Sequence, residues 1–475
     1  MSVAITTGSS GGTPNRLEIN DFYEWNSTYS FVPPVVFIMQ TKGTLDDPTS
    51  FFQIGSIHGF PYVSWNRVTG SKLMDPSSNA AGYCNHGNVL FPTWHKPYVA
   101  LRQKVAATYV VDCAAWKKAA DELRQPYWDW AANSVPPDEG RKITVNNPFY
   151  NYKFHAIDPS FLFAFHDRKA TIRYPTKLKE TLRAHQLVYT INTYNMLTRI
   201  QSWGAFSNDT IGAGGSYYNA IHAGIGGPNG HMSEVPTSTV LLAFDPVFFL
   251  HHYNVDHGTI IICPDILINQ ETRTTSSDVE NTDKLGYTYP DFSGLDMTNR
   301  QAVYTAIGGL INRLYGTSIS DRLLAANAPP SGAPALSTFG SAPPYHGSHD
   351  WTAHIEVKKY EVGQSFFQQT FCYNFAGAYF AFVNSEAKRC CYRRILHLNH
   401  AIAKHSGLDS LDPELHWRVQ KTNGEPIYLA ALQATIFSTP LSYPPSSIFP
   451  VTGEHRRCSH ITHGHPGGCR LRLFF

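Results

Sequence analysis

The sequence has no long apolar run and no strong excess of charge of either sign. Its longest apolar stretch, VLLAFDPVFFL, is interrupted by Asp245 and Pro246, which argues against a membrane-spanning segment. The formal net charge is +2 at pH 7, so neither nucleic acid nor an anionic membrane surface is an expected partner. The N-terminal residues also lack a basic start followed by an apolar core. We therefore expect a cytoplasmic protein that acts on small molecules.

Cysteine is scarce and irregularly placed. The 475 residues contain 8 cysteines without a repeated spacing, which excludes a small disulfide-rich scaffold and predicts free thiols for most of them. No internal repeat is visible. Hydrophobic residues make up 42% of the chain and charged residues 16%, as in an ordinary globular protein. A chain of this length is expected to form one large domain and a smaller one.

Composition divides the chain into two parts. Residues 321–350 are rich in Ala, Pro, Gly and Ser, which predicts a linker. Residues 1–320 precede it and contain helical periodicity, including a predicted amphipathic helix over residues 97–124. Residues 351–475 alternate apolar and polar positions and are rich in β-branched and aromatic residues. The prediction is a mainly α protein with a smaller β-rich C-terminal domain.

Histidine is abundant, with 22 residues that fall in clusters. The first cluster contains His58 in FFQIGSIHGF, His86 in GYCNHGNVLF and His95 in TWHKPYV. Three neutral imidazoles that leave one coordination position open suit a metal that binds an exogenous molecule. His86 and His95 can reach one ion only if the loop between them folds back, so their spacing permits a site without requiring it. A last histidine-containing stretch, CSHITHGHPGGC, is more typical of a solvated tail, and we assign it no function.

The second cluster lies in AFDPVFFLHHYNVD, where Asp245 and Pro246 indicate the start of a helix. Asp256 follows His252 by four residues and shares its helical face. This carboxylate could accept the second ring proton of His252 or bond backbone at the helix end. Only one of the two adjacent histidines is expected to point into a given site. The face shared with Asp256 selects His252 and leaves His251 as a supporting residue.

Several motifs resemble, in order, the signatures of fungal tyrosinases: HGNVLFPTWHKPY, PYWDWA, GHMS and DPVFFLHHYNVD. PNRLEINDF near the start and IEVKKY in the C-terminal part are also similar. The resemblance implies a four-helix bundle that holds two copper ions, each through three histidines, with dioxygen as co-substrate. It implies that His58, His86 and His95 hold the first copper. PYWDWA is expected to be structural, with Asp129 bonding neighbouring backbone.

The second copper site departs from the family pattern, in which a His-x-x-x-His pair lies on one helix. In SYYNAIHAGIGGPNGHMS, His222 matches the second histidine of the pair, which puts Tyr218 in place of the first. An alternative alignment makes His222 the first histidine and Gly226 the missing second, but the distance to GHMS favours the former. The resemblance then implies His222 and His252 as ligands, with water, Tyr218 or a distant histidine as the third. Asn219 matches the residue that helps to orient the catalytic water.

The resemblance also implies a covalent bond and an activity. Cys84 matches the cysteine that forms a thioether with the neighbouring ligand histidine, here His86. The implied activity is that of a tyrosinase, which converts monophenols to o-diphenols and o-quinones and serves melanin-type pigment formation. A catechol oxidase without hydroxylase activity and a non-catalytic copper- or oxygen-binding relative are the alternatives.

The remaining expectations concern partners and regulation. Small phenols are the expected substrates, and a homo-oligomer is compatible with the sequence. By resemblance, the β-rich C-terminal part covers the active site until proteolysis removes it.

Overall fold

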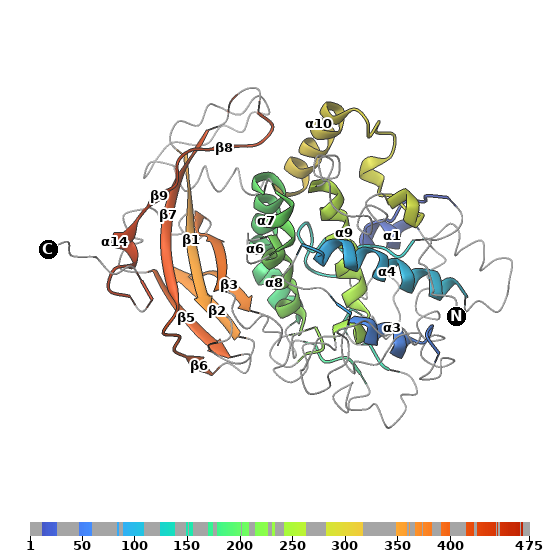
Figure 1. The fold of residues 1–475 in the computed structure, drawn as a ribbon, viewed down its shortest axis with the longest axis horizontal. Helices are drawn as coiled ribbons and strands as arrows, with labels where there is room; N and C mark the ends of the chain where they lie inside the picture. Colours follow the sequence, from blue (N-terminus) through green and yellow to red (C-terminus); the bar gives the residue numbers. More distant parts are fainter. Residues whose placement is uncertain are drawn as a thin grey trace.

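The computed structural model shows a helical part beside a β-rich part (Figure 1). It describes residues 12–25, 47–58, 83–84, 89–108, 124–137, 149–150, 152–154, 170–173, 178–200, 202–208, 214–226, 230–232, 242–262, 282–316, 348–358, 361, 366–372, 374–381, 391–399, 415–421, 425–442, 444, 447–465 and 467–468. Within these ranges, no helix is both long and apolar enough to cross a membrane.

The core of the helical part is formed by α4 (Phe91–Thr108), α6 (Leu178–Arg199), α8 (Gly214–Gly226) and α9 (Val247–Ile262). Helix α4 packs against α9, and α6 packs against both α8 and α9. The smaller elements of this part are α1 (Ile19–Trp25), α3 (Phe51–His58), α7 (Trp203–Ser207), α10 (Arg300–Ile311), the 3-10 turns Leu242–Phe244, Thr282–Leu285 and Pro290–Phe292, and the π-helical turn Asn312–Gly316.

Helix α9 is buried along almost its whole length. The Asp245 carboxylate accepts a hydrogen bond from the Val247 amide (3.0 Å), so the helix begins one residue after Pro246. It ends at Ile262, two residues before Pro264, which cannot continue a helix. A helix surrounded by other elements on all sides carries its polar residues into the core. For this reason the adjacent histidines of α9 are both buried.

Helix α4 begins earlier than its sequence suggests. The predicted helix starts at Pro97, whereas α4 starts at Phe91 and contains Pro97 in its interior. The proline removes one backbone hydrogen bond. Burial of Phe91, Tyr98 and Val99 on both sides of the proline outweighs this loss. The predicted continuation over residues 109–123 lies outside the described residues.

The N-terminal segment packs onto the helical core. Arg16 is fully buried, and its guanidinium carbon lies 3.8 Å from the ring centre of Tyr253 and 4.3 Å from that of Tyr287. It also donates a hydrogen bond to the Gln125 carbonyl (2.8 Å). A guanidinium between two aromatic faces is stabilised by cation–π attraction where its contact with water is lost. Arg16 is therefore part of the core, whereas Gly12 and Thr13 before it are exposed.

The β-rich part contains two antiparallel sheets. Their strands are β1 (Ser348–Lys358), β2 (Phe366–Cys372), β3 (Asn374–Ala381), β4 (Cys391–His397), β5 (Leu415–Lys421), β6 (Pro426–Ile427), β7 (Gln433–Ser442), β8 (Val451–Thr452) and β9 (Arg456–Arg457). One sheet has the order β4-β1-β7-β8, with β9 also paired to β7, and the other has the order β3-β2-β5-β6. Strand β1 begins within the last residues of the predicted linker, whose remaining residues lie outside the described ranges.

The histidine-containing stretch near the C-terminus is not the solvated tail that its composition suggests. It forms the short helix α14 (Ser459–Thr462), which packs against β7. Cys458 and Ile461 belong to the apolar core of the β-rich part. His460 and His463 are exposed. The apolar positions between the histidines therefore anchor the segment.

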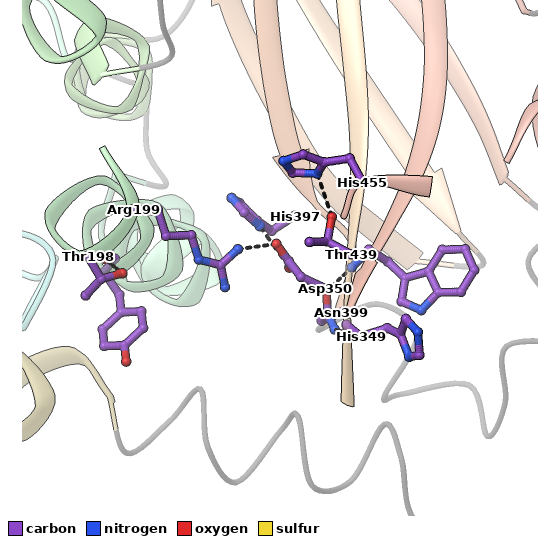
Figure 2. Close-up of polar contacts among 10 residues, drawn as sticks. Thr198, Arg199, His349, Asp350, His397, Asn399, Thr439 and His455 are labelled. Carbon is purple, nitrogen blue, oxygen red and sulfur yellow. Dashed lines mark hydrogen bonds and ion pairs between the residues drawn. The ribbon is translucent and has the colours of Figure 1, made fainter. Parts of the chain in front are cut away.

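A buried polar cluster joins the two parts of the molecule (Figure 2). Arg199, at the end of α6, forms an ion pair with Asp350 on β1. The other oxygen of Asp350 lies 3.1 Å from Nδ1 of His397 on β4. Burial by itself would raise the pKa of Asp350, but the attraction of His397 and Arg199 and their hydrogen bonds hold it below its usual value. The carboxylate thus links a helix to two strands.

Candidate metal centre

The first group of possible metal ligands comes from three separate segments. His58 is the last residue of α3, His95 lies in the second turn of α4, and Cys84 lies in the segment between them. Each offers a ligand atom, and these atoms all lie within 4.8 Å of one another. His86 lies outside the described residues. Its place as a ligand, and the thioether with Cys84, therefore remain predictions.

Local hydrogen bonding orients His95. Its Nδ1 donates to the Phe91 carbonyl, four residues earlier (2.7 Å). A carbonyl can only accept, so the proton of a neutral imidazole is on Nδ1 and the lone pair is on Nε2. The Cys84 sulfur lies 3.4 Å from this Nε2. A carbonyl on the far ring nitrogen is a common way to orient a metal-binding histidine.

The second group is formed by His222 of α8 and by both His251 and His252 of α9, with ligand atoms again within 4.8 Å of one another. Both adjacent histidines lie in this group, so the assignment of His252 as the ligand and of His251 as a supporting residue stays a prediction. Neighbouring residues of a helix project about 100° apart. The centre of the His222 ring lies 4.4 Å from that of His251 and 6.1 Å from that of His252.

The His252 ring connects the two groups. It stacks on the His95 ring with 4.3 Å between centres and 6° between planes. Phe248 lies on another side of it, 4.1 Å from the His252 centre and 4.7 Å from that of His58. The imidazoles of the two groups therefore lie in one buried aromatic pocket.

Burial makes His251 and His252 neutral. Loss of hydration lowers the pKa of both side chains well below the usual value, and the surrounding histidines lower it further. Among the described residues, Nε2 of His251 and Nδ1 of His252 have no hydrogen-bond partner. A buried polar atom without a partner costs about 1–3 kcal/mol. A neutral imidazole with a ring nitrogen that lacks a protein partner, as in His252, fits a copper ion.

Tyr218 stands where the family has the first histidine of the second copper site. Its side chain packs away from the group of His222, His251 and His252. It is 2% exposed, and its ring meets those of Phe206 and Trp130 edge to face. A side-chain carbon at Gly258 would lie 2.7 Å from the Tyr218 hydroxyl. Gly258 is six residues beyond His252, almost two turns along α9. The backbone of Asn219 lies in α8, but its side chain is not among those that the structure describes.

Asp256 has a different set of partners from those expected. It accepts hydrogen bonds from the hydroxyls of Tyr287 (2.5 Å) and Tyr289 (2.7 Å). Lys96 Nζ lies 3.7 Å from its other oxygen. The ring proton of His252 and the helix backbone were the expected partners. The loop after α9 instead brings two tyrosines to the same buried position, and sequence spacing does not show this.

Trp130 is a further residue of the site that the sequence did not indicate. In the PYWDWA motif, Asp129 bonds the backbone amides of Ala131 (3.2 Å) and Ala132 (3.1 Å), which confirms its structural role. The Trp130 indole, however, donates to Nδ1 of His251 (3.2 Å). A buried indole N–H needs an acceptor, which is a general signal but does not identify a residue far along the chain.

Comparison with known proteins identifies a family model and relatives that match this sequence. The profile described as "Common central domain of tyrosinase" matches residues 48–259. Polyphenol oxidase 2 of Agaricus bisporus is 31% identical over 96% of each chain. The chain belongs to the tyrosinase family. The tyrosinase of Neurospora crassa is 29% identical over 67% of this chain and 58% of its own length.

Solved structures of tyrosinases share the fold. The structure of recombinant mushroom tyrosinase has a TM-score of 0.77 at 26% identity and covers 95% of this chain and 97% of its own. An Aspergillus oryzae pro-tyrosinase has a TM-score of 0.70 at 20% identity, which shows a common fold alone. Membership of the tyrosinase family makes this chain a copper oxidoreductase of the type-3 class.

Proposed function

We propose that this chain is a tyrosinase that hydroxylates monophenols to o-diphenols and oxidises these to o-quinones, in melanin-type pigment formation. His58, His86 and His95 would hold the first copper. His222 and His252 would hold the second. When bound, the copper pair supplies the electron transfer and dioxygen activation that side chains lack. The observation that carries the proposal is the stack of His95 on His252, which brings the two groups of imidazoles into one pocket.

The residues around the histidines bind and orient the phenol. Phe248 is fully buried beside His252 and provides an apolar face for an aromatic ring. The Phe91 carbonyl holds His95 with Nε2 directed toward the site. Asn219 precedes His222 by three residues on α8, which places the two on adjacent positions of one helical face. By resemblance to the family, Asn219 would orient a water molecule that accepts the proton of the phenol hydroxyl.

A catechol oxidase is the second candidate. It is favoured by the position of Tyr218, which packs beside Phe206 and Trp130 and leaves the second site with fewer of the family's histidines. The two activities are separated by assaying the copper-loaded protein with tyrosine and with catechol. A tyrosinase forms quinone from both. Quinone from catechol alone would identify a catechol oxidase, and none from either would identify a non-catalytic copper- or oxygen-binding relative.

We also infer that the β-rich part restricts access to the copper site. Strand β3 contacts α8, the helix that carries His222. The ion pair between Arg199 and Asp350 holds β1 against the end of α6. Limited proteolysis between residues 340 and 380 is expected to raise the rate of catechol oxidation. An unchanged rate after complete cleavage would contradict this role.

A further inference from the structure

Trp130 and His251 form a buried, hydrogen-bonded pair within the candidate copper site. Trp130 is 1% exposed and His251 is fully buried. The indole Nε1 donates to His251 Nδ1 across 3.2 Å, and the two ring centres lie 6.0 Å apart. Tyr189 and Tyr218 meet the Trp130 ring edge to face and hold its orientation. The indole is thus a fixed neighbour of the imidazole.

This hydrogen bond determines which nitrogen of His251 carries the proton. An indole N–H can only donate, so Nδ1 of His251 must accept through its lone pair. An imidazole whose Nδ1 lone pair accepts a hydrogen bond has no proton on that nitrogen, so the ring is in its neutral form. A neutral imidazole carries one proton. That proton is therefore on Nε2.

The protonated Nε2 lies among the other histidines. His251, His222 and His252 offer nitrogens within 4.8 Å of one another, and Nε2 of His251 has no hydrogen-bond partner among the described residues. A nitrogen that carries a proton has no lone pair for a metal ion. His251 could become a copper ligand only by giving up its bond to Trp130 or by losing a second proton. It is already arranged to donate a hydrogen bond.

We propose that Trp130 holds His251 as a hydrogen-bond donor to the phenolate oxygen of a substrate bound beside His222 and His252, and that His251 is not the third ligand of the second copper. This rests on the proposed action on phenols. An anionic oxygen is the acceptor that gains most from a buried N–H donor. Phe248, packed against His252, provides the apolar contact for the ring of the same molecule.

The proposal is tested by measuring copper per chain and ligand affinity in His251→Leu, His251→Gln and Trp130→Phe. His257→Gln is the matched control, because His257 is a buried histidine of the same helix that donates to Asp291 instead. The probe for the oxygen is 4-nitrophenolate, and nitrobenzene reports contact with the ring alone. Both are titrated into the copper-loaded full-length protein.

The expected result is native copper content in all four variants. The dissociation constant of 4-nitrophenolate should rise on the order of 10-fold or more in His251→Leu, because a hydrogen bond to a charged oxygen is lost. His251→Gln should lose less affinity, since its amide can accept from Trp130 and donate to the ligand. Trp130→Phe should fall between these variants. Nitrobenzene should bind all variants alike.

Two results would overturn the proposal. Loss of one copper in His251→Gln would make His251 a ligand, and unchanged 4-nitrophenolate affinity in His251→Leu would remove its role as a donor. Should His251→Leu fail to fold, His251→Gln and Trp130→Phe carry the same comparison. Failure of the proposed function is distinguishable, because the native protein would then form no quinone from tyrosine or from catechol.

Discussion

His252 of the copper site and two histidines outside it, His397 and His257, are all buried, but their ring nitrogens have different surroundings. His252 is 3% exposed and His397 is 7% exposed. Nδ1 of His252 has no hydrogen-bond partner among the described residues, whereas Nδ1 of His397 donates to Asp350 (3.1 Å). His257 likewise donates to Asp291 (2.9 Å).

This difference separates two uses of the same side chain. A buried imidazole bonded to a carboxylate stabilises the fold, as Figure 2 shows for His397 at the junction of the two parts. An imidazole held in an apolar pocket without such a partner costs stability unless something binds it. Burial alone therefore does not identify a metal site. The chemistry of the neighbouring atoms does.

The largest expected effect follows from removing a histidine of the copper site that has no carboxylate partner. His252→Leu should lower catechol oxidation by more than about 100-fold and reduce the copper content. Loss of a residue that only orients a metal ligand already weakens metal binding or activity, and loss of the ligand itself should weaken them more. In the copper-free protein the free energy of unfolding should change by less than about 1 kcal/mol, because an unpartnered polar group is replaced by an apolar one of similar size. Metal analysis and denaturant unfolding measure the two effects. A large loss of stability without copper would contradict the comparison.

Removing the carboxylate that bonds a histidine outside the copper site should instead lower the stability and leave copper binding unchanged. Asp350→Ala leaves Arg199 and His397 without their carboxylate and is expected to cost about 3 kcal/mol of unfolding free energy. Copper content should stay at the native value. Thr198→Ala is the control, because Thr198 neighbours Arg199 and its hydroxyl bonds only the helix backbone at Tyr194 (2.7 Å). Equal stability of the two variants would show that the junction contributes nothing.

The same carboxylate predicts a dependence on pH. The pKa of Asp350 is lower in the folded than in the unfolded protein, so its contribution is complete above the unfolded pKa of about 3.9. It declines as the pH falls from there through the folded pKa. The difference in stability between native protein and Asp350→Asn should thus be constant from pH 5 to 7 and shrink below about pH 4. Unfolding measured across this range tests the sign, and a difference that grows on acidification would refute it.

The smallest effect is expected at His257, whose partner Asp291 is nearer the surface. Its side chain is 18% exposed, against 2% for His257. Burial acts to raise the pKa of Asp291, but the hydrogen bond from His257 lowers it overall. His257→Gln should cost about 1 kcal/mol and leave copper binding unchanged. A measured loss of copper would show that this histidine belongs to the site after all.

Short sequence motifs predicted which residues form the site. Hydrogen-bond partners that lie far away in the sequence could not be predicted from them. The motifs around His58, His95 and His252 are local, and the structure brings these residues together. The partners of Asp256 come from a loop more than thirty residues away, and nothing in the spacing indicates them. The hydrogen bond of Trp130 spans 121 positions of the chain.

Helix boundaries were missed for a different reason. The start of α4 at Phe91 depends on the burial of residues on both sides of Pro97, which outweighs the local effect of the proline. The grouping of both adjacent histidines with His222 depends on where α8 brings His222 beside α9. Periodicity gives the faces of a helix, but the neighbouring helix determines which of them carries the chemistry.

The most direct test of the account is a copper titration of the metal-free protein, with the bound metal counted per chain. Because His58 and His95 are joined by His86 in the proposed first site, whereas the second has His222 and His252, two classes of site are expected. One copper should bind on the order of 10-fold more tightly than the other, as expected for loss of one imidazole contact. Two coppers of equal affinity would contradict the unequal sites, and no bound copper would contradict the account as a whole.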